Sequence, residues 1–285
     1  MSRNKDRLGL GDTKPDNNGP PPQVLQQETS GFSFVVPTEF VELPSQGRYY
    51  PEDHPLHNED SIEIKQMTAK EEDILTSRTL LRKGVALDRV LQSLIVDPTI
   101  NANHLLVGDR NAMIIAARSS AYGHMYETQV TCPSCQVTQD YAFDLNEVQV
   151  YHATELTNAE ITVNDDGTFD VTLPRTEIVV TFRLLSGTDE KTLVEAASSR
   201  KSKSHERAVT AQLSKMVVAV NGVRTQEALD YLVNHIPSMD SRHLRAAYKT
   251  AAPNIDLTQY FECGECDYEA DMEVPLTADF FWPGG

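Results

Sequence analysis

Two short cysteine motifs constrain this 285-residue chain more than any other feature. Cys132-Pro-Ser-Cys135 and Cys263-Gly-Glu-Cys266 use all four cysteines of the protein. Each motif lies between two extended segments of mixed polar and apolar residues, which predicts a tight turn in a β-hairpin. A Cys-x-x-Cys turn brings two thiolates to one side, and two such turns supply the four sulfur ligands of a tetrahedral zinc site. The sequence therefore predicts a four-cysteine zinc ribbon whose two hairpins are far apart in the chain.

Three other chemistries compete with zinc at these cysteines: buried free thiols, disulfides and a redox-active dithiol. The shared spacing of the two pairs argues against unrelated buried thiols. The chain begins Met-Ser-Arg-Asn-Lys without the apolar run of a signal peptide, so we expect a reducing compartment rather than disulfide formation. A redox-active pair favours the start of a helix, whereas both motifs here lie between strand-like segments. Four thiolates leave no open position for water, so the expected zinc is structural and not catalytic.

The charge balance bears on the class of partner. The formal charge is −17, with 42 acidic and 25 basic side chains. Broad binding to nucleic-acid phosphates requires clustered lysine and arginine, so this balance argues against a nucleic-acid partner. No segment approaches the length and apolarity of a membrane span. We therefore expect the partners to be proteins.

The order of the predicted elements favours an α+β fold with a mainly helical body and short β-hairpins, two of which form the ribbon. The residues between the two halves of the ribbon amount to a large insert. Five parts are expected: an extended N-terminal arm, disordered by itself, at 1–30; a strand-turn plus helical domain at 31–123; the ribbon halves at 124–146 and 255–275; an inserted β-hairpin plus helical subdomain at 147–254; and an aromatic C-terminal tail at 276–285.

Start and stop signals place three helices before the first cysteine motif. Thr68 and Glu71 have the spacing of a capping box that opens a helix extending through Leu81, and Gly84 is its expected C-cap. Leu87 to Val96 is predicted as a second helix. A third is expected from Arg110 to Ala121, with the preceding Asp109 as its N-cap.

The insert is expected to begin with strands and to continue with helices. Thr168 to Leu185 predicts a hairpin that turns around Pro174 to Thr176. Arg200-Lys-Ser-Lys203 is a small basic surface segment. The residues from Arg207 to Val220 are predicted as the longest apolar helix. Thr225 is the expected cap of another helix, and a last one runs from Ser238 to Ala252.

The region 38–146 carries several short motifs in a fixed order. They are Phe40-Val-x-Leu-Pro-Ser-x-Gly47 with Tyr50-Pro51, Met67-Thr-x-x-Glu-Glu-Asp-Ile-Leu75, Gly108-Asp-Arg-Asn111, Tyr122-Gly123 and Cys132-Pro-x-Cys135. In this order the motifs resemble the T4-like bacteriophage baseplate protein family, whose members are hub subunits of contractile tails. The helices and the second cysteine motif that follow are consistent with that family.

The resemblance implies a structural subunit of a contractile phage tail baseplate, in the hub or next to it. It implies contacts with other baseplate and tail-tube proteins, and multiple copies in a symmetric assembly. The protein is then expected in the virion tail baseplate, and in the host cytoplasm during assembly. The N-terminal arm and the aromatic tail are the expected contacts with neighbours, although Phe280, Phe281 and Trp282 are equally compatible with packing on their own core.

The alternative to an assembly protein is a zinc-ribbon protein that binds nucleic acid or assists transcription. The acidic residues around the motifs, such as Asp140, Glu262 and Asp267, weaken that alternative. An enzyme has no support, because the sequence contains no phosphate-binding loop, no nucleophile elbow and no His-Glu-x-x-His motif. His54 and His57 are the only close histidine pair, and we expect them to be surface residues of a loop.

Overall fold

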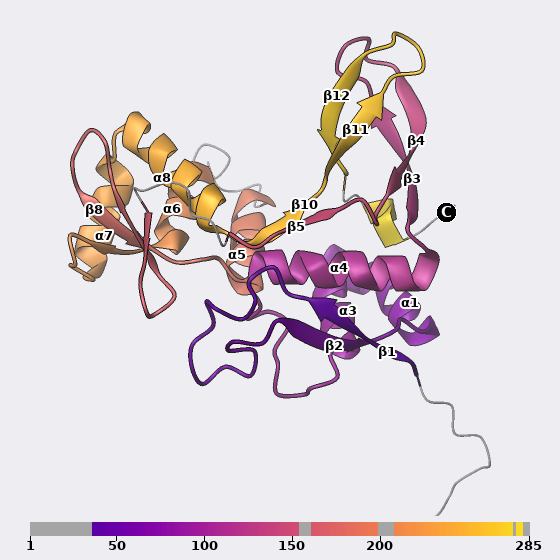
Figure 1. Ribbon diagram of the computed structural model, residues 1–285, viewed down its shortest axis with the longest axis horizontal. Coiled ribbons are helices and arrows are strands. Elements are labelled where there is room, and N and C mark those ends of the chain that lie inside the picture. The colour runs from indigo at the N-terminus through magenta and orange to yellow at the C-terminus, as the bar shows by residue number, and fades with distance from the viewer. Residues whose placement is uncertain (1–35, 154–160, 199–207, 276–277, 282–285) are drawn as a thin grey trace, which may run out of the picture. The chain divides into compact units, whose positions relative to one another are not determined.

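The computed structural model describes residues 36–153, 161–198, 208–275 and 278–281. The predicted N-terminal arm, the basic segment Arg200–Lys203 and Trp282 lie outside the described residues. The described part contains helices and small antiparallel sheets, which is compatible with the expected α+β class (Figure 1). Within it, every helix is too short or too polar to cross a bilayer.

The first part of the chain contains a two-stranded sheet and four helices. Strand β1 pairs antiparallel with β2, in which the buried Ile62 and Ile64 alternate with more exposed residues. The elements are β1 (Thr38–Glu42), β2 (Ser61–Lys65), α1 (Ala69–Thr76), α2 (Arg78–Arg82), α3 (Ala86–Leu94) and α4 (Val107–Tyr122).

The predicted capping box is present, but the helix that it opens is shorter than expected. The backbone N–H of Thr68 donates to Glu71 Oε2 at 3.0 Å, and the Thr68 side chain accepts from the N–H of Lys70. The prediction of one helix through Leu81 is wrong, because the chain leaves helical geometry at Ser77 (φ −67°, ψ 104°) and restarts as α2. At this point Thr76 Oγ1 donates back to the carbonyl of Glu72, a local bond that competes with a continuous helix.

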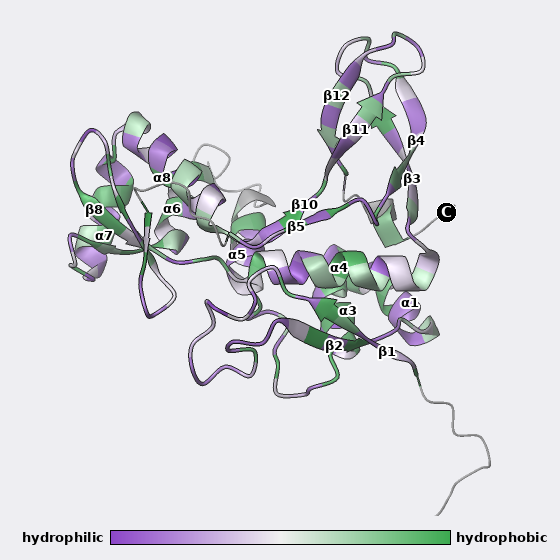
Figure 2. Cartoon of the chain, viewed as in Figure 1, coloured by the Kyte–Doolittle hydropathy of each residue, from purple (hydrophilic) through white to green (hydrophobic). Residues whose placement is uncertain are grey.

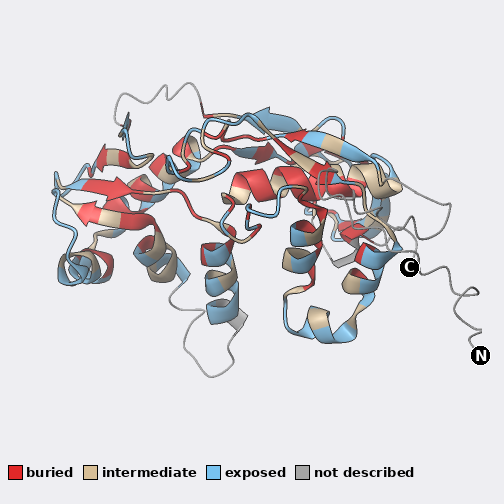
Figure 3. Cartoon of the chain, turned by 90° about the horizontal axis from the view of Figure 1, so that it is seen from below, coloured by how far each residue is buried: buried red, intermediate tan, exposed pale blue. Residues whose placement is uncertain are grey.

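Helix α4 starts earlier than predicted and is the most buried helix of this part. It begins at Val107, so the expectation that Asp109 caps a helix starting at Arg110 is wrong. Asp109 lies in the first turn, fully buried, and its carboxylate binds groups far away in sequence instead of the local backbone. Figure 3 shows this long helix in red over most of its length. Gly123, at φ 83°, is the C-cap of α4.

Both cysteine motifs lie at the turns of β-hairpins, as predicted. The strands of the first hairpin are β3 (Met125–Thr131) and β4 (Thr138–Asp144), and those of the second are β11 (Thr258–Glu262) and β12 (Glu269–Glu273). We call these two together the cysteine hairpins. A short antiparallel ladder of β5 (Gln149–Tyr151) with β10 (Asn254–Asp256) lies at their base (Figure 1).

Close packing holds this ladder on α4. A Cβ atom at Gly108 of α4 would lie 2.1 Å from the carbonyl oxygen of Pro253, so only glycine allows the approach. One apolar cluster then runs from β1 and β2 through α3 and α4 into the cysteine hairpins, where it includes Phe143 and Phe261.

The insert contains a four-stranded antiparallel sheet in the order β6-β7-β8-β9. The predicted hairpin is confirmed by β7 and β8, which turn between Thr172 and Val179. The prediction of one helix from Arg207 to Val220 is wrong, because the chain changes from α6 to the edge strand β9 after Met216. The strands are β6 (Ile161–Val163), β7 (Phe169–Thr172), β8 (Val179–Phe182) and β9 (Val217–Val220).

The change at Met216 has a physical reason. Val217-Val-Ala-Val220 is rich in β-branched residues that fit a pleated sheet, whereas the apolar run alone does not distinguish strand from helix. In the described part of the insert, four helices accompany the sheet: α5 (Gly187–Ser198), α6 (Ala208–Met216), α7 (Gln226–His235) and α8 (Ser238–Ala251). Thr225 occupies the expected N-cap position of α7, but its side chain makes no capping hydrogen bond.

The insert has an apolar cluster of its own. Phe169, Phe182, Leu213, Met216 and Leu244 are among its buried members, and they come from the sheet and from α6 and α8. Backbone bonds join the insert to the residues before α4. The N–H of Gly187 donates to the carbonyl of Leu105 at 3.0 Å, and that of Thr188 to the carbonyl of Asn103 at 2.8 Å.

Candidate metal centre

The structure brings all four predicted ligand residues together. The Sγ atoms of Cys132, Cys135, Cys263 and Cys266 all lie within 4.8 Å of one another. Cys132 Sγ is 3.8 Å from Cys266 Sγ, and Cys135 Sγ is 3.8 Å from Cys263 Sγ. A tetrahedron with Zn–S bonds of about 2.3 Å has S···S edges of about 3.8 Å. The donor set therefore fits a tetrahedral four-cysteine site in both chemistry and spacing.

The two turns repeat one local geometry. The backbone N–H of Cys132 donates to the carbonyl of Val137, and the N–H of Cys263 donates to that of Tyr268, both at 2.9 Å. The residue after each second cysteine, Gln136 or Asp267, has a positive φ of 60° or 53°. That left-handed residue directs the chain back into the second strand of the hairpin. The two sulfur pairs are thus presented in equivalent ways, and the 3.8 Å distances both join a first cysteine to a second cysteine of the other hairpin.

Direct contacts also join the two hairpins. Tyr141 Oη donates to the carbonyl oxygen of Tyr260 at 3.1 Å, and Gln259 Nε2 donates to that of Asp144 at 2.7 Å. The Tyr141 ring lies 5.1 Å from the ring of Phe261, in a tilted arrangement. Next to the sulfurs, the N–H of Gly264 donates to Gln139 Oε1 at 3.2 Å. These contacts position the two turns opposite each other.

The thiols influence one another electrostatically. Burial raises the pKa of Cys132, but the N–H groups of Cys135 and Ser134 donate to its sulfur and lower that pKa to about 7. The N–H of Val137 lowers the pKa of Cys135, whereas burial and the neighbouring thiols, foremost Cys266, raise it to about 12. One negative sulfur opposes ionisation of the next, so four thiolates in this space require a cation among them.

The cysteines are free of disulfides, and the histidine pair lies in a loop away from them. None of the four cysteines is in a disulfide. His54 Nδ1 accepts from the N–H of Leu56 at 3.1 Å, and His57 Nδ1 lies 2.7 Å from the carbonyl oxygen of Tyr50. In the described part of the chain, the histidine pair is therefore occupied by loop hydrogen bonds and is not gathered with other metal-binding groups.

A buried polar network in the first part of the chain was not predicted. Asp109 accepts hydrogen bonds from the N–H of Ser45 at 3.0 Å, from Ser45 Oγ at 2.6 Å and from Tyr50 Oη at 2.7 Å. The N–H of Leu106 donates to Tyr50 Oη at 3.0 Å. Burial raises the pKa of Asp109, although the three donors partly oppose that rise. The signal was present in the sequence, because Ser45, Tyr50 and Asp109 all belong to the motifs that carry the family resemblance.

A second unpredicted group fixes the C-terminal segment. The buried Arg118 donates through Nε to the carbonyl of Phe280 at 2.7 Å and through its other nitrogens to the carbonyls of Gly123 and Met125. Phe280 and Phe281, in the 3-10 helix η2 (Ala278–Phe281), are 2% and 7% exposed and belong to the cluster of the first part. Of the two interpretations of the aromatic tail, packing on its own core is correct for these two phenylalanines.

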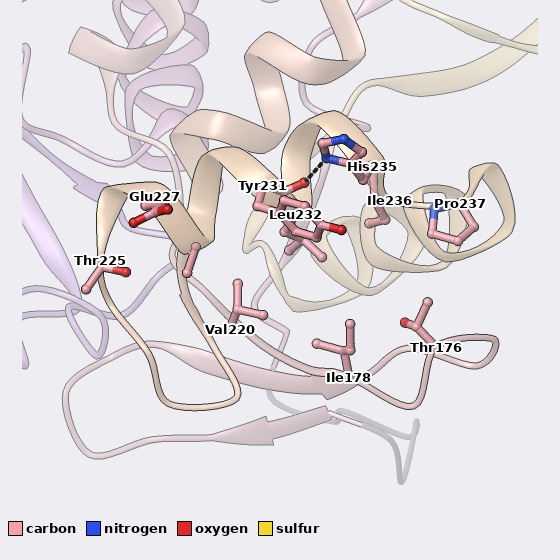
Figure 4. A pocket seen from close by; sticks show the side chains of 11 residues that line it. Thr176, Ile178, Val220, Thr225, Glu227, Tyr231, Leu232, His235, Ile236 and Pro237 are labelled. Carbon is pink, nitrogen blue, oxygen red and sulfur yellow. Dashed lines mark hydrogen bonds between the residues drawn. The ribbon is translucent and has the colours of Figure 1, made fainter.

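The insert carries an apolar hollow of about 530 Å³ between α7 and the sheet (Figure 4). Ile178, Val220 and Leu232 lie on its walls, and Tyr231 and His235 stand at one side with their rings stacked at 4.3 Å. His235 Nδ1 is 2.8 Å from the backbone carbonyl oxygen of Tyr231, so that nitrogen is already engaged. The lining also includes Glu227, whose side chain lies apart from that of His235 in Figure 4.

Comparison with known proteins identifies the family. A family model described as T4 bacteriophage base plate protein matches residues 36–282, which is most of the chain. Neither the curated proteins nor the solved structures contain a match.

Proposed function

This chain belongs to the T4 bacteriophage base plate protein family and has a structural role in the phage baseplate, and we propose that it is a hub or hub-adjacent subunit held together by one structural zinc ion. In this proposal Cys132, Cys135, Cys263 and Cys266 are the ligands. A bound zinc ion neutralises the thiolates and cross-links the two hairpins. The four ligands leave no open coordination position, so the role of the metal is mechanical.

The observation that carries the proposal is the convergence of the four sulfurs from two turns that are distant in sequence. Cys132 and Cys266, 134 positions apart, are 3.8 Å from each other at Sγ. Between the hairpins lies the insert with its own sheet and apolar cluster. One metal ion would therefore fix both ends of the insert at the same place, which suits a subunit that must keep its shape inside a large particle.

Partners follow from the family. A baseplate protein contacts other baseplate proteins, and we propose that this chain also contacts tail-tube proteins and is present in several copies. The N-terminal arm at 1–30 is the segment proposed to bind neighbours. Its low apolar content would not stabilise it alone, whereas a groove between subunits offsets the ordering entropy.

The first test is metal analysis of purified protein. We expect one zinc per chain, and Cys263→Ser to lose it while Ser134→Ala, in the same type of turn, keeps it. In infected cells, the Cys263→Ser subunit should be missing from isolated baseplates and the Ser134→Ala subunit present. A wild-type protein purified without metal and still fully incorporated into baseplates would contradict the zinc proposal.

A nucleic-acid role has little support from the charges of the cysteine hairpins. Residues 124–146 and 255–275 contain no lysine or arginine. A gel-shift experiment with generic duplex DNA at physiological ionic strength should therefore show no binding. Micromolar binding would instead favour the zinc-ribbon nucleic-acid alternative.

A further inference from the structure

One face of α8 presents a row of cations along a groove. Arg242, Arg245 and Lys249 are exposed, and their spacing of three and four residues places them on one side of the helix. The groove has a volume of about 980 Å³ and is also lined by β10 and by Tyr151. In the described part of the chain, neither arginine forms an ion pair.

The groove is not uniformly basic. Asp256 and Glu273 also line it. The pKa of Asp256 is lowered mainly by the hydroxyl and backbone N–H of Thr258, with a smaller contribution from Lys249. Lys249 thus has a nearby carboxylate, whereas the two arginines are available to an acidic partner. Arginine is suited to this because its planar guanidinium binds a carboxylate through two parallel hydrogen bonds.

The outer face of the β11–β12 hairpin has the opposite character. Glu262 lies directly across from Glu269, and Tyr260 across from Asp271, so the four side chains share one face. All are exposed, and the Tyr260 ring is 53% exposed. Like charges at directly opposed positions destabilise a hairpin. Among the described residues neither glutamate forms an ion pair, and along β12 the same face continues to Glu273 at the edge of the α8 groove.

We propose that the outer face of β11–β12 in one copy of the protein docks along the basic face of α8 in a second copy. Arg242 and Arg245 would pair with Glu262 and Glu269. The guanidinium of one arginine would also form a cation–π contact with the exposed ring of Tyr260. The contact deepens the proposed role as a multi-copy assembly subunit and rests on it. Since the two surfaces differ, the contact is head-to-tail, and its repetition generates a ring or an open chain of subunits.

A second copy is the occupant that the charges favour. A nucleic acid would match the arginines, but Asp256 and Glu273 in the same groove would repel its phosphates. Every copy carries both complementary faces, and neither cysteine hairpin has a lysine or arginine that would neutralise its own acidic face. The net charge of −17 opposes association of free copies. We therefore expect self-association to be weak in solution and to become evident at millimolar protein concentration.

The test is reciprocal charge reversal in the zinc-loaded full chain, followed by sedimentation equilibrium. Wild-type protein should self-associate, and R242E/R245E and E262R/E269R should each weaken association by about tenfold or more, because close opposite charges are replaced by like charges. An equimolar mixture of the two variants should recover association to within about threefold of wild type, since one combination of faces is again complementary.

Controls separate a local contact from a net-charge effect. R82E/R89E changes the same number of exposed arginines in α2 and α3, away from the proposed faces, and should associate like wild type. Circular dichroism and zinc content verify that each variant is folded. Monomeric wild-type protein throughout the concentration range, or a mixture that stays monomeric, would overturn the contact. Neither result would affect zinc binding or incorporation into baseplates, which are measured separately.

Discussion

The insert and the cysteine hairpins are both built from antiparallel strands, but they bury very different amounts of apolar surface. In β8 of the insert, Val180, Thr181 and Phe182 are all buried. In β12 of the second hairpin no residue is buried, and exposed positions alternate with half-buried ones. Figure 2 shows the corresponding contrast, with hydrophilic colours along much of β4 and β12. The insert sheet has helices packed on it, while each cysteine hairpin packs through one face only.

The comparison explains where the cysteines are. Burial of apolar surface contributes roughly 25 cal/mol per Å², so a sheet with helices on it is stabilised by its own core. A two-stranded hairpin is at best marginally stable in water. Two hairpins with one narrow shared interface therefore need a cross-link, and a metal site is a usual solution for such small modules. The cysteines lie at the turns that end these hairpins.

Removal of the metal should destabilise the cysteine hairpins and leave the insert folded. Chelation, or Cys263→Ser, should remove an apparent binding free energy of order 10 kcal/mol from the hairpins. Hydrogen exchange should then show loss of protection in β3, β4, β11 and β12, while the amides of β7 and β8 stay protected. Ser134→Ala is the matched control, because it alters the same kind of turn without removing a ligand.

Loss of protection at the same rate in the insert and in the hairpins would contradict the separation of the two regions. It would mean that the apolar cluster of the insert has no stability of its own. Unchanged protection of the hairpins after chelation would contradict the metal cross-link.

The core of the insert can be weakened without touching the metal ligands. Phe182→Ala should lower the free energy of unfolding of the insert by about 3–5 kcal/mol, because it leaves a cavity beside Phe169. Zinc content should not change. Val179→Ala, at an exposed position of the same strand, is the control and should cost much less. Loss of zinc from Phe182→Ala would show that the hairpins depend on the insert core.

The sequence predicted the cysteine site better than the insert, and the reason is physical. A Cys-x-x-Cys turn is specified by a few adjacent residues, so its geometry is local and readable. Val217–Val220 is different, because its apolar run fits a buried helix as well as a strand. Val217–Val220 forms an edge strand because it pairs with the neighbouring strand β8, where Val180 lies opposite Val220.

The first residue of α4 also could not be predicted from local sequence, because of the role of Asp109. Asp109 has the right type and place for a local N-cap. The structure uses it for Ser45 and Tyr50, which are 64 and 59 positions away, so no local rule identifies its role. The three residues do share one sequence feature, because all of them belong to the motifs that resemble the baseplate protein family.

The polar network around Asp109 belongs to neither the insert nor the cysteine hairpins. Asp109→Asn should lower the free energy of unfolding by about 1–3 kcal/mol, since the amide nitrogen cannot accept a hydrogen bond, whereas both carboxyl oxygens can accept in either protonation state. The pKa of the Asp109 carboxyl is raised in the folded protein by burial. The folded state then holds its proton to higher pH than the unfolded state.

The sign of the pH effect follows from that difference. Wild-type stability from this group is complete below the pKa of an ordinary aspartate and falls as pH rises through the higher pKa of the folded state. Asp109→Asn lacks this titration, so its stability difference from wild type should narrow as pH rises across that window. Urea unfolding at several pH values measures this difference in the free energy of unfolding. Asp140→Asn, at an exposed position, serves as control. A difference in unfolding free energy that widens as pH rises would contradict the raised pKa of Asp109.

The smallest expected effect concerns the charges of the cysteine hairpins. Glu269→Lys replaces the like-charge pair with Glu262 by an opposite-charge pair directly across the two strands. In zinc-saturated protein we expect the free energy of unfolding to rise by about 0.2–1 kcal/mol. Glu127→Lys in the first hairpin is the control, because its partner across the strands is the uncharged Ala142 and no repulsion is relieved. Both variants change the net charge equally, so a gain at 269 that exceeds the gain at 127 isolates the local pair. Equal stability of the two variants would show that the Glu262–Glu269 repulsion is screened by solvent. If Glu269→Lys is the more stable hairpin yet weakens self-association, the acidic face of β11–β12 is retained for its contact and not for the fold.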